Sequence, residues 1–97
     1  MAFMNITFLG TGVLVPHEDS ADPIIGFYTT RRVWATSPAV AEKEAKQLVL
    51  GEWTSGPYAQ SNKGALPVLN VESICQIGLL RGLFTRRPTG YTFYWSE

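Results

Sequence analysis

The sequence is poor in charged residues, which make up 16% of its 97 residues, whereas soluble domains average about 25%. Eight basic and eight acidic residues leave a formal net charge of zero. Nucleic-acid binders gain much of their affinity from positive contacts with phosphates. We therefore expect no nucleic-acid partner.

Cysteine and histidine are equally scarce, with Cys75 and His17 the single examples. One cysteine excludes an intramolecular disulfide, and one histidine excludes a histidine-rich metal site. His17 shares a short polar loop with Glu18, Asp19 and Asp22. That loop has a proline at each end and matches no known calcium loop, so we interpret it as a surface turn. We predict no metal and no cofactor.

Long apolar runs are missing as well. No stretch approaches the roughly 18–20 residues that a membrane span requires, and no cleavable signal pattern opens the chain. We therefore expect no membrane partner and a cytoplasmic location. The length predicts a single domain over residues 1–97.

Apolar side chains, by contrast, are plentiful. Hydrophobic residues make up 45% of the chain and aromatic residues 12%, including three tryptophans. A small domain has a large surface for its volume, so this much apolar surface is hard to bury within one subunit. The surplus predicts either a ligand cleft or a contact with a partner.

Four segments have strand character. Residues 2–9 are rich in β-formers and precede the glycine turn Gly10-Thr11-Gly12, with a short continuation at residues 13–15. Residues 24–36 alternate, which places Arg31 on one face and Arg32 on the other. The third and fourth strands are residues 68–77, where Ile74 breaks the alternation and indicates a bulge or a second buried face, and residues 91–95.

One segment has the period of a helix. Ser37 suits an N-cap and Pro38 the first helical position. From there to Trp53 an apolar stripe runs along one side, formed by Ala41, Ala45, Leu48, Val49 and Trp53. Glu52 falls inside this stripe, and we expect a frayed last turn to release it to water.

Residues 78–88 fit either a short helix or a long loop. Their three arginines, Arg81, Arg86 and Arg87, form a local basic patch. We expect these side chains to be solvated or paired with the acidic loop at residues 18–22, rather than to bind an anion.

The element order β-β-α-β-β predicts an α+β sandwich in the style of the ferredoxin-like folds. Its sheet has four mostly antiparallel strands, with one main helix on one face. One helix cannot cover both faces of such a sheet. We therefore expect the open face to pair with a second copy, giving a homodimer.

The most suggestive constellation combines arginine with aromatic side chains. Arginine offers a planar fork for carboxylate or phosphate, and the same residue types are enriched at protein interfaces. The candidate ligand or interface residues are Tyr28, Arg31, Arg32, Trp34, Tyr94 and Trp95. They predict a non-enzymatic binding or adaptor module for a small anionic ligand or a protein partner.

Two alternatives stay open. In the first, a small enzyme works in an intersubunit cleft, where Arg31 or Arg32 holds an anion and Glu52 or Glu72 is the acid or base. Cys75 lies far from His17 in the sequence, which disfavours a Cys–His nucleophile. In the second alternative, the chain is a structural subunit of a larger complex.

Two parts of the sequence resemble known proteins. Residues 4–12 resemble the opening strand of metallo-β-lactamase-fold hydrolases, but the histidine-rich metal motif of those enzymes is missing. The pattern of Gly26–Arg31, Glu52-Trp53, residues 67–72 and Gly90–Tyr94 is similar to small uncharacterised bacterial proteins, including products of integron gene cassettes. This second resemblance covers residues 24–94 and implies a compact α+β domain that self-associates, without transferring an activity.

Overall fold

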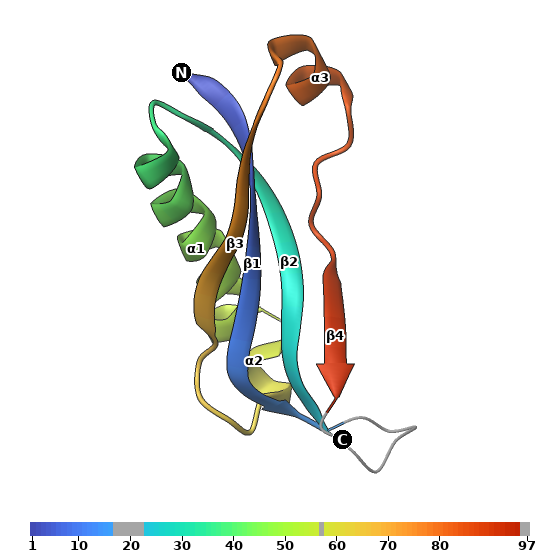
Figure 1. The fold of residues 1–97 in the computed structure, drawn as a ribbon. Coiled ribbons are helices and arrows are strands. Elements are labelled where there is room, and N and C mark those ends of the chain that lie inside the picture. Colours follow the sequence, from blue (N-terminus) through green and yellow to red (C-terminus); the bar gives the residue numbers. More distant parts are fainter. Residues whose placement is uncertain (17–22, 57, 96–97) are drawn as a thin grey trace.

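The structure, a computed structural model, describes residues 1–16, 23–56 and 58–95. It has the predicted α+β architecture, with one sheet and a long helix across one of its faces (Figure 1). The elements in chain order are β1 (Ala2–Val15), β2 (Ile24–Ala35), α1 (Pro38–Ser55), α2 (Tyr58–Ser61), β3 (Val68–Ile77), α3 (Leu79–Phe84) and β4 (Tyr91–Trp95). Among the described residues, no helix has the length and apolar character needed to cross a bilayer.

The sheet has the strand order β3-β1-β2-β4, and each neighbouring pair is antiparallel. The predicted antiparallel sheet of four strands is therefore confirmed. Because β2 and β3 are both antiparallel to β1, they run parallel to each other, and α1 forms the crossover between them. This order does not by itself assign the sheet to the ferredoxin-like arrangement.

Helix α1 begins as predicted. The Ser37 hydroxyl accepts a hydrogen bond from the Val40 amide at 3.3 Å, and Pro38 is the first helical residue. Leu48, by contrast, is 52% exposed, so its predicted place in the core is wrong. The buried row takes every fourth residue only, and it consists of Ala41, Ala45, Val49 and Trp53. The two alanines let the helix lie close to the sheet, and only this row of α1 side chains is buried against the strands.

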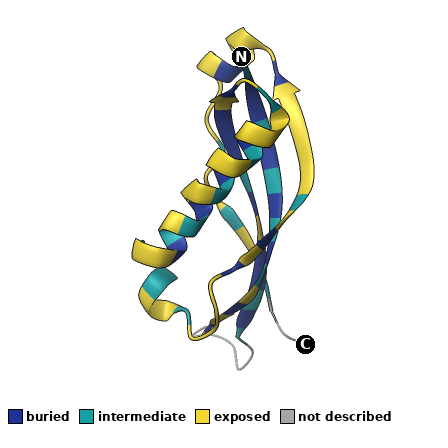
Figure 2. Ribbon diagram, turned by 90° about the vertical axis from the view of Figure 1, so that its left-hand side faces the viewer, coloured by how far each residue is buried: buried dark blue, intermediate teal, exposed yellow. Residues whose placement is uncertain are grey.

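The core lies between α1 and the strands that it crosses. Figure 2 shows buried residues on the inner side of α1 and along the strands behind it. The sheet contributes large apolar side chains from all three long strands, among them Met4, Ile6, Phe8, Phe27, Val33 and Leu69. This layer is one continuous cluster, so the chain has one core.

The turn expected at Gly10-Thr11-Gly12 is wrong, because β1 continues through these glycines. β1 continues to Val15, with a register irregularity after Thr11. A Cβ atom at Gly10 would lie 2.3 Å from the tip of the Phe27 ring. Gly10 is thus needed to admit an aromatic ring from the neighbouring strand, and a turn is not the reason for the glycine.

Of the two explanations for the broken alternation at Ile74, the bulge is confirmed. Ser73 pairs with Thr7 and Val71 with Phe8, so Glu72 is the extra residue of β3. The bulge shifts the alternation by one residue, which places Val71 and Ile74 on the same side of the sheet as α1.

The connection from β3 to β4 runs from one edge of the sheet to the other. It carries α3, which packs over β1 on the face opposite α1. The contact is close, because a Cβ atom at Gly82 would lie 2.2 Å from the Phe3 ring. One end of the otherwise open face is therefore covered by the chain itself.

Candidate functional site

Arg31 and Glu52 form an ion pair on the α1 side of the sheet. The Arg31 side chain is 5% exposed, and its Nη2 donates to Glu52 Oε2 at 2.8 Å. Its Nη1 donates to the Thr29 hydroxyl at 2.6 Å and to the Thr30 carbonyl at 3.1 Å. The expected release of Glu52 into water is thus wrong. The helix continues to Ser55 and holds the carboxylate, 40% exposed, against the buried guanidinium.

This pairing limits what either group can do chemically. The guanidinium of Arg31 already has a carboxylate, a hydroxyl and a carbonyl as acceptors, all within the subunit. A buried charge without its partner is costly. An external ligand that bound Arg31 would have to displace Glu52, and the free energy of binding would be reduced by the cost of breaking this pair. The geometry favours a structural role for both residues over anion binding and acid–base chemistry.

An aromatic cluster surrounds the pair. The Arg31 guanidinium lies 5.1 Å from the centre of the Tyr91 ring, in cation–π geometry. Trp53 stacks between Phe27 and Tyr58, with ring centres 5.1 and 4.9 Å away. Phe93 stacks on Tyr91 at 5.5 Å. These rings come from α1, α2, β2 and β4, and together they join α2 and the C-terminal strand β4 to the core.

Two polar atoms inside this cluster have no hydrogen-bond partner, namely the Tyr91 hydroxyl and the Trp53 indole N–H. Burial raises the pKa of Tyr91 to about 12, and the nearby Glu52 carboxylate adds to the rise, while Arg31 opposes it. The phenol therefore stays neutral over a wider pH range than an ordinary tyrosine.

Tyr91 should make the protein sensitive to alkali. Its folded pKa of about 12 exceeds the unfolded value of 10.0, so its contribution is fully present below pH 10 and is lost as the pH rises towards 12. Two pKa units correspond to ~2.7 kcal/mol, and we expect about 1 kcal/mol because solvent screens a half-buried group. The measurement is the free energy of unfolding in urea at pH values from about 9 to about 12, a range that brackets the pKa of about 10 of a free tyrosine.

The control separates Tyr91 from other groups that titrate in the same range. The Tyr91→Phe variant should lose less stability than the natural chain across this range, whereas Tyr28→Phe, at an exposed ring, should follow the natural chain. Equal slopes for all three proteins would contradict the assignment. At neutral pH we expect Tyr91→Phe to be nearly neutral, because it removes a hydroxyl without a partner.

Arg32 lies on the opposite face and anchors α3. Its Nε donates to Asn5 Oδ1 at 3.0 Å. Its Nη1 lies within hydrogen-bonding distance of the Gly82 carbonyl at 3.3 Å, the Thr85 carbonyl at 3.2 Å and the Thr85 hydroxyl at 2.8 Å. A cation at the C-terminal end of a helix satisfies free carbonyls and favours the helix dipole. Arg32 is thus also committed within the subunit.

The predicted arginine–aromatic constellation is divided between the two faces. Tyr28, Arg32, Trp34 and Tyr94 share the face opposite α1, and Arg31 lies on the other. Tyr28 and Tyr94 are neighbours, with ring centres 6.1 Å apart, and Trp34 packs edge-on against Phe3 at 4.7 Å. The side chain of Trp95 lies outside the described part of the structure.

The remaining candidates are dispersed. Glu72 is exposed at the bulge of β3, and Cys75 is exposed further along the same strand. The acidic loop around His17 lies outside the described residues. Within residues 1–16, 23–56 and 58–95, no group of three or more potential metal ligands comes together.

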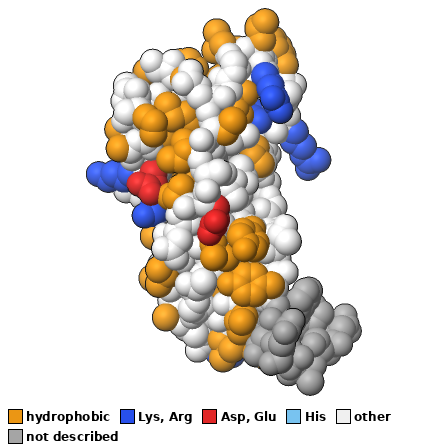
Figure 3. All heavy atoms as spheres, viewed as in Figure 1, with side chains coloured by type: hydrophobic (Ala, Val, Ile, Leu, Met, Phe, Trp, Pro, Cys, Tyr) orange, Lys and Arg blue, Asp and Glu red, His pale blue; other side chains and the backbone are white. Residues whose placement is uncertain are grey.

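The most exposed apolar surface is on α3. Gly82 is the one buried residue of this helix, and four of its six residues are large apolar side chains that face solvent. We call these four the α3 patch: Leu79, Leu80, Leu83 and Phe84, which are 55–82% exposed. Hydrophobic side chains gather at this end of the molecule, and basic side chains lie just below them (Figure 3).

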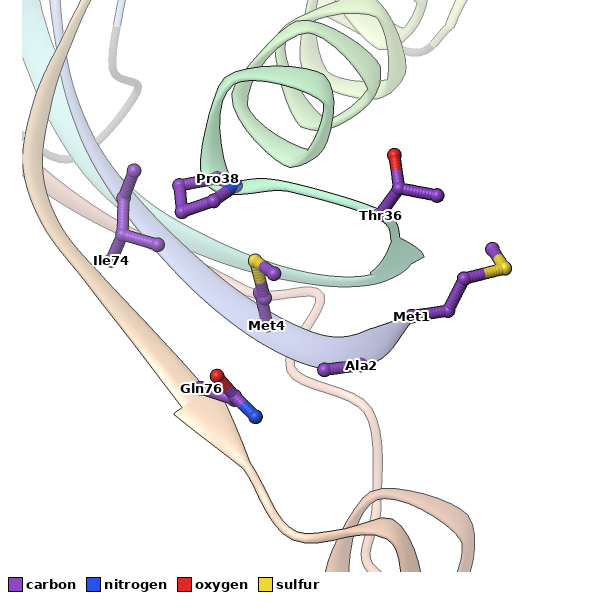
Figure 4. A pocket seen from close by; sticks show the side chains of 7 residues that line it. All are labelled: Met1, Ala2, Met4, Thr36, Pro38, Ile74 and Gln76. Atoms are coloured by element: carbon purple, nitrogen blue, oxygen red, sulfur yellow. The ribbon is translucent and has the colours of Figure 1, made fainter.

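Two shallow depressions lie close to the start of β1. The larger, about 480 Å³, lies between β1, β3 and the start of α1 (Figure 4), and its lining consists of Met1, Ala2, Met4, Thr36, Pro38, Ile74 and Gln76. The smaller, about 240 Å³, brings Trp34 and Phe3 together with Leu79 of the α3 patch. Neither is lined by a charged side chain.

Sequence reasoning missed the α3 patch. It left residues 78–88 undecided between helix and loop and assigned the binding surface to Tyr28, Arg31, Arg32 and Trp34. The available signal was a dense run of large apolar residues interrupted by arginine, in a segment without acidic residues from Ser73 to Ser96. The periodicity of so short a helix does not reveal which side faces the sheet.

Comparisons of the chain with protein-family models, with curated proteins and with solved structures give no match. The similarity to integron cassette products therefore stays a prediction. The case for a function depends on the geometry of this chain alone.

Proposed function

We propose that the protein is a non-enzymatic binding module and that the α3 patch is its binding surface. The observation that carries this proposal is the orientation of α3. The helix docks on Phe3 through Gly82, its smallest residue, and turns four large apolar side chains towards solvent.

The orientation has a cost in a lone subunit. Burying a Leu or Phe side chain contributes about 1.5–3 kcal/mol, and an amphipathic helix gains that stability by facing such residues inwards. α3 forgoes this gain, although the ring of Phe3 is within reach. A contiguous apolar patch on a small protein usually marks an interaction site.

The charges near the patch favour an anionic partner, which reverses the expectation from the sequence that the arginines of residues 78–88 bind no anion. Arg81, Arg86 and Arg87 are exposed beside it, and none of them pairs with an acidic residue that the structure describes. The segment from Ser73 to Ser96 has no acidic residue at all. The preferred ligand is therefore one that combines negative charge with apolar surface.

Anilinonaphthalene sulfonate, an apolar dye with one negative charge, tests this proposal. We expect a saturable rise in fluorescence with the folded protein, and a loss of most of it in the double variant Leu80→Ser/Phe84→Ser. The stability of this variant should change by less than about 0.5 kcal/mol, because both side chains are already in water.

A matched variant removes apolar side chains elsewhere. Val40 and Leu48 are exposed on the outer side of α1, and Val40→Ser/Leu48→Ser should keep the dye response. If both double variants bind the dye equally, or if the folded protein does not bind it, the patch is not a binding surface and the proposal is wrong.

The homodimer predicted from composition is part of the proposal, as is the cytoplasmic location. A second copy would cover the part of the sheet face that α3 leaves free, around Tyr28 and Tyr94. The exposed ring of Tyr28, with Tyr94 beside it, supports this placement. Of the residues named for the enzyme alternative, Arg31 and Glu52 neutralise each other, and Arg32 donates to Asn5 and Thr85 within the subunit. Glu72 alone is exposed without such a contact among the described residues, so we prefer the binding module.

A further inference from the structure

We propose that the α3 patch docks on the surface of an anionic lipid bilayer. Its leucine and phenylalanine side chains would enter the interface, and the neighbouring arginines would bind lipid phosphates. This inference deepens the proposed function, on which it rests, by naming the class of partner. The sequence-based expectation of no membrane partner concerned spanning segments, and peripheral docking needs none.

The position of the patch fits a flat partner. The molecule is elongated, with extents of 44 × 22 × 21 Å, and α3 lies at one end of the long axis (Figure 1). Phe84 and Leu80 belong to this helix, and their side chains are 82% and 71% exposed. Highly exposed apolar side chains at one end of an elongated molecule suit insertion between lipid headgroups.

The order of apolar and basic side chains also fits a bilayer. In Figure 3 hydrophobic side chains form the tip and basic side chains lie just below it, with no acidic side chain beside them in this view. Interfacial segments place their apolar side chains about 5–10 Å into the boundary, with basic residues at the level of the phosphates. Arg81, Arg86 and Arg87 lie within or directly after the helix that carries the patch.

Charge disfavours a second copy as the occupant. Two α3 patches face to face would bring three arginines from each chain together, and the segment from Ser73 to Ser96 has no acidic residue to compensate them. Like charges at an interface oppose association. An anionic surface turns the same arginines into favourable contacts.

The experiment is co-sedimentation of the full chain with lipid vesicles. One set contains phosphatidylcholine alone, and the other contains phosphatidylcholine and phosphatidylglycerol in equal parts. We expect binding to the anionic vesicles only, with the affinity falling as salt rises. Polyglutamate, which is anionic but has no acyl chains, should compete poorly.

Two variants test the two kinds of contact separately. Phe84→Ser should weaken binding about ten-fold, because it removes an inserted ring. Arg86→Gln/Arg87→Gln should weaken it about twenty-five-fold, at roughly five-fold for each arginine near an anionic membrane. The controls are Leu48→Ser and Lys43→Gln/Lys63→Gln, which remove the same kinds of group at exposed positions elsewhere and should bind normally.

Each other outcome identifies a different occupant and overturns the inference. Strong competition by polyglutamate indicates an acidic protein, and a fall in mass by light scattering in Phe84→Ser, without lipid, indicates a second copy. If the dye binds as proposed but anionic vesicles do not, only the bilayer inference fails. If neither binds, both proposals fail.

Discussion

Replacing Phe27 with alanine is expected to lower the free energy of unfolding by about 4 kcal/mol. Phe27 is fully buried, and its ring contacts Trp53, Tyr91 and Phe93 at centre distances of 5.1, 5.0 and 6.4 Å. The cavity would open in the middle of the aromatic cluster, and removal of a buried Phe side chain costs about 3–5 kcal/mol. This is a large part of the roughly 5–15 kcal/mol that stabilises a typical domain.

The neighbouring residue provides a matched control. Tyr28 is adjacent in sequence, but its ring lies on the opposite face and is 45% exposed. Urea unfolding monitored by tryptophan fluorescence should show a loss below about 1 kcal/mol for Tyr28→Ala. Similar losses in both variants would mean that the two faces of β2 are wrongly assigned.

Replacing Arg32 with methionine is expected to detach α3 from the sheet. The variant removes every hydrogen bond that holds the end of this helix to β2, and it leaves the Gly82 and Thr85 carbonyls without these donors. Loss of donors to such groups costs about 2 kcal/mol, which corresponds to about 30-fold more frequent opening. Amide hydrogen exchange at Gly82 and Thr85, which donate to Gly78 and Arg81, measures the opening.

Arg31→Met is the counterpart on the other face. It breaks the pair with Glu52, so exchange should rise near the end of α1 and stay unchanged in α3. Trypsin should also cleave after Arg81 faster in Arg32→Met than in the natural chain, because the docked helix α3 holds this peptide bond in a helical conformation. Unchanged exchange in the α3 of Arg32→Met would show that Gly82 against Phe3 is a sufficient anchor, and that Arg32 is dispensable.

Local signals in the sequence were enough for most elements. The cap at Ser37-Pro38, the bounds of β3 and β4, and a bulge as one of two explanations at Ile74 were all predicted, because each depends on neighbours within a few residues. The predictions for Gly10 and Leu48 failed. In both cases the deciding partner, the Phe27 ring or the closeness of α1 to the sheet, comes from elsewhere in the chain.

The candidate binding surface shows the same division. Composition predicted surplus apolar surface and a partner for it, and alternation correctly separated Arg31 from Arg32. It could not show that each arginine is used within the subunit, one by α1 and the other by α3, since those contacts join residues 21 to 53 positions apart.

The amino-acid sequence by itself determined the α+β class, the strand and helix segments and the excess of apolar side chains, because propensity, capping and alternation act over short distances. Only the tertiary structure decided where that excess is exposed. The path of the chain across the sheet places Gly82 against Phe3, and this one close contact turns the leucines and the phenylalanine of α3 outwards.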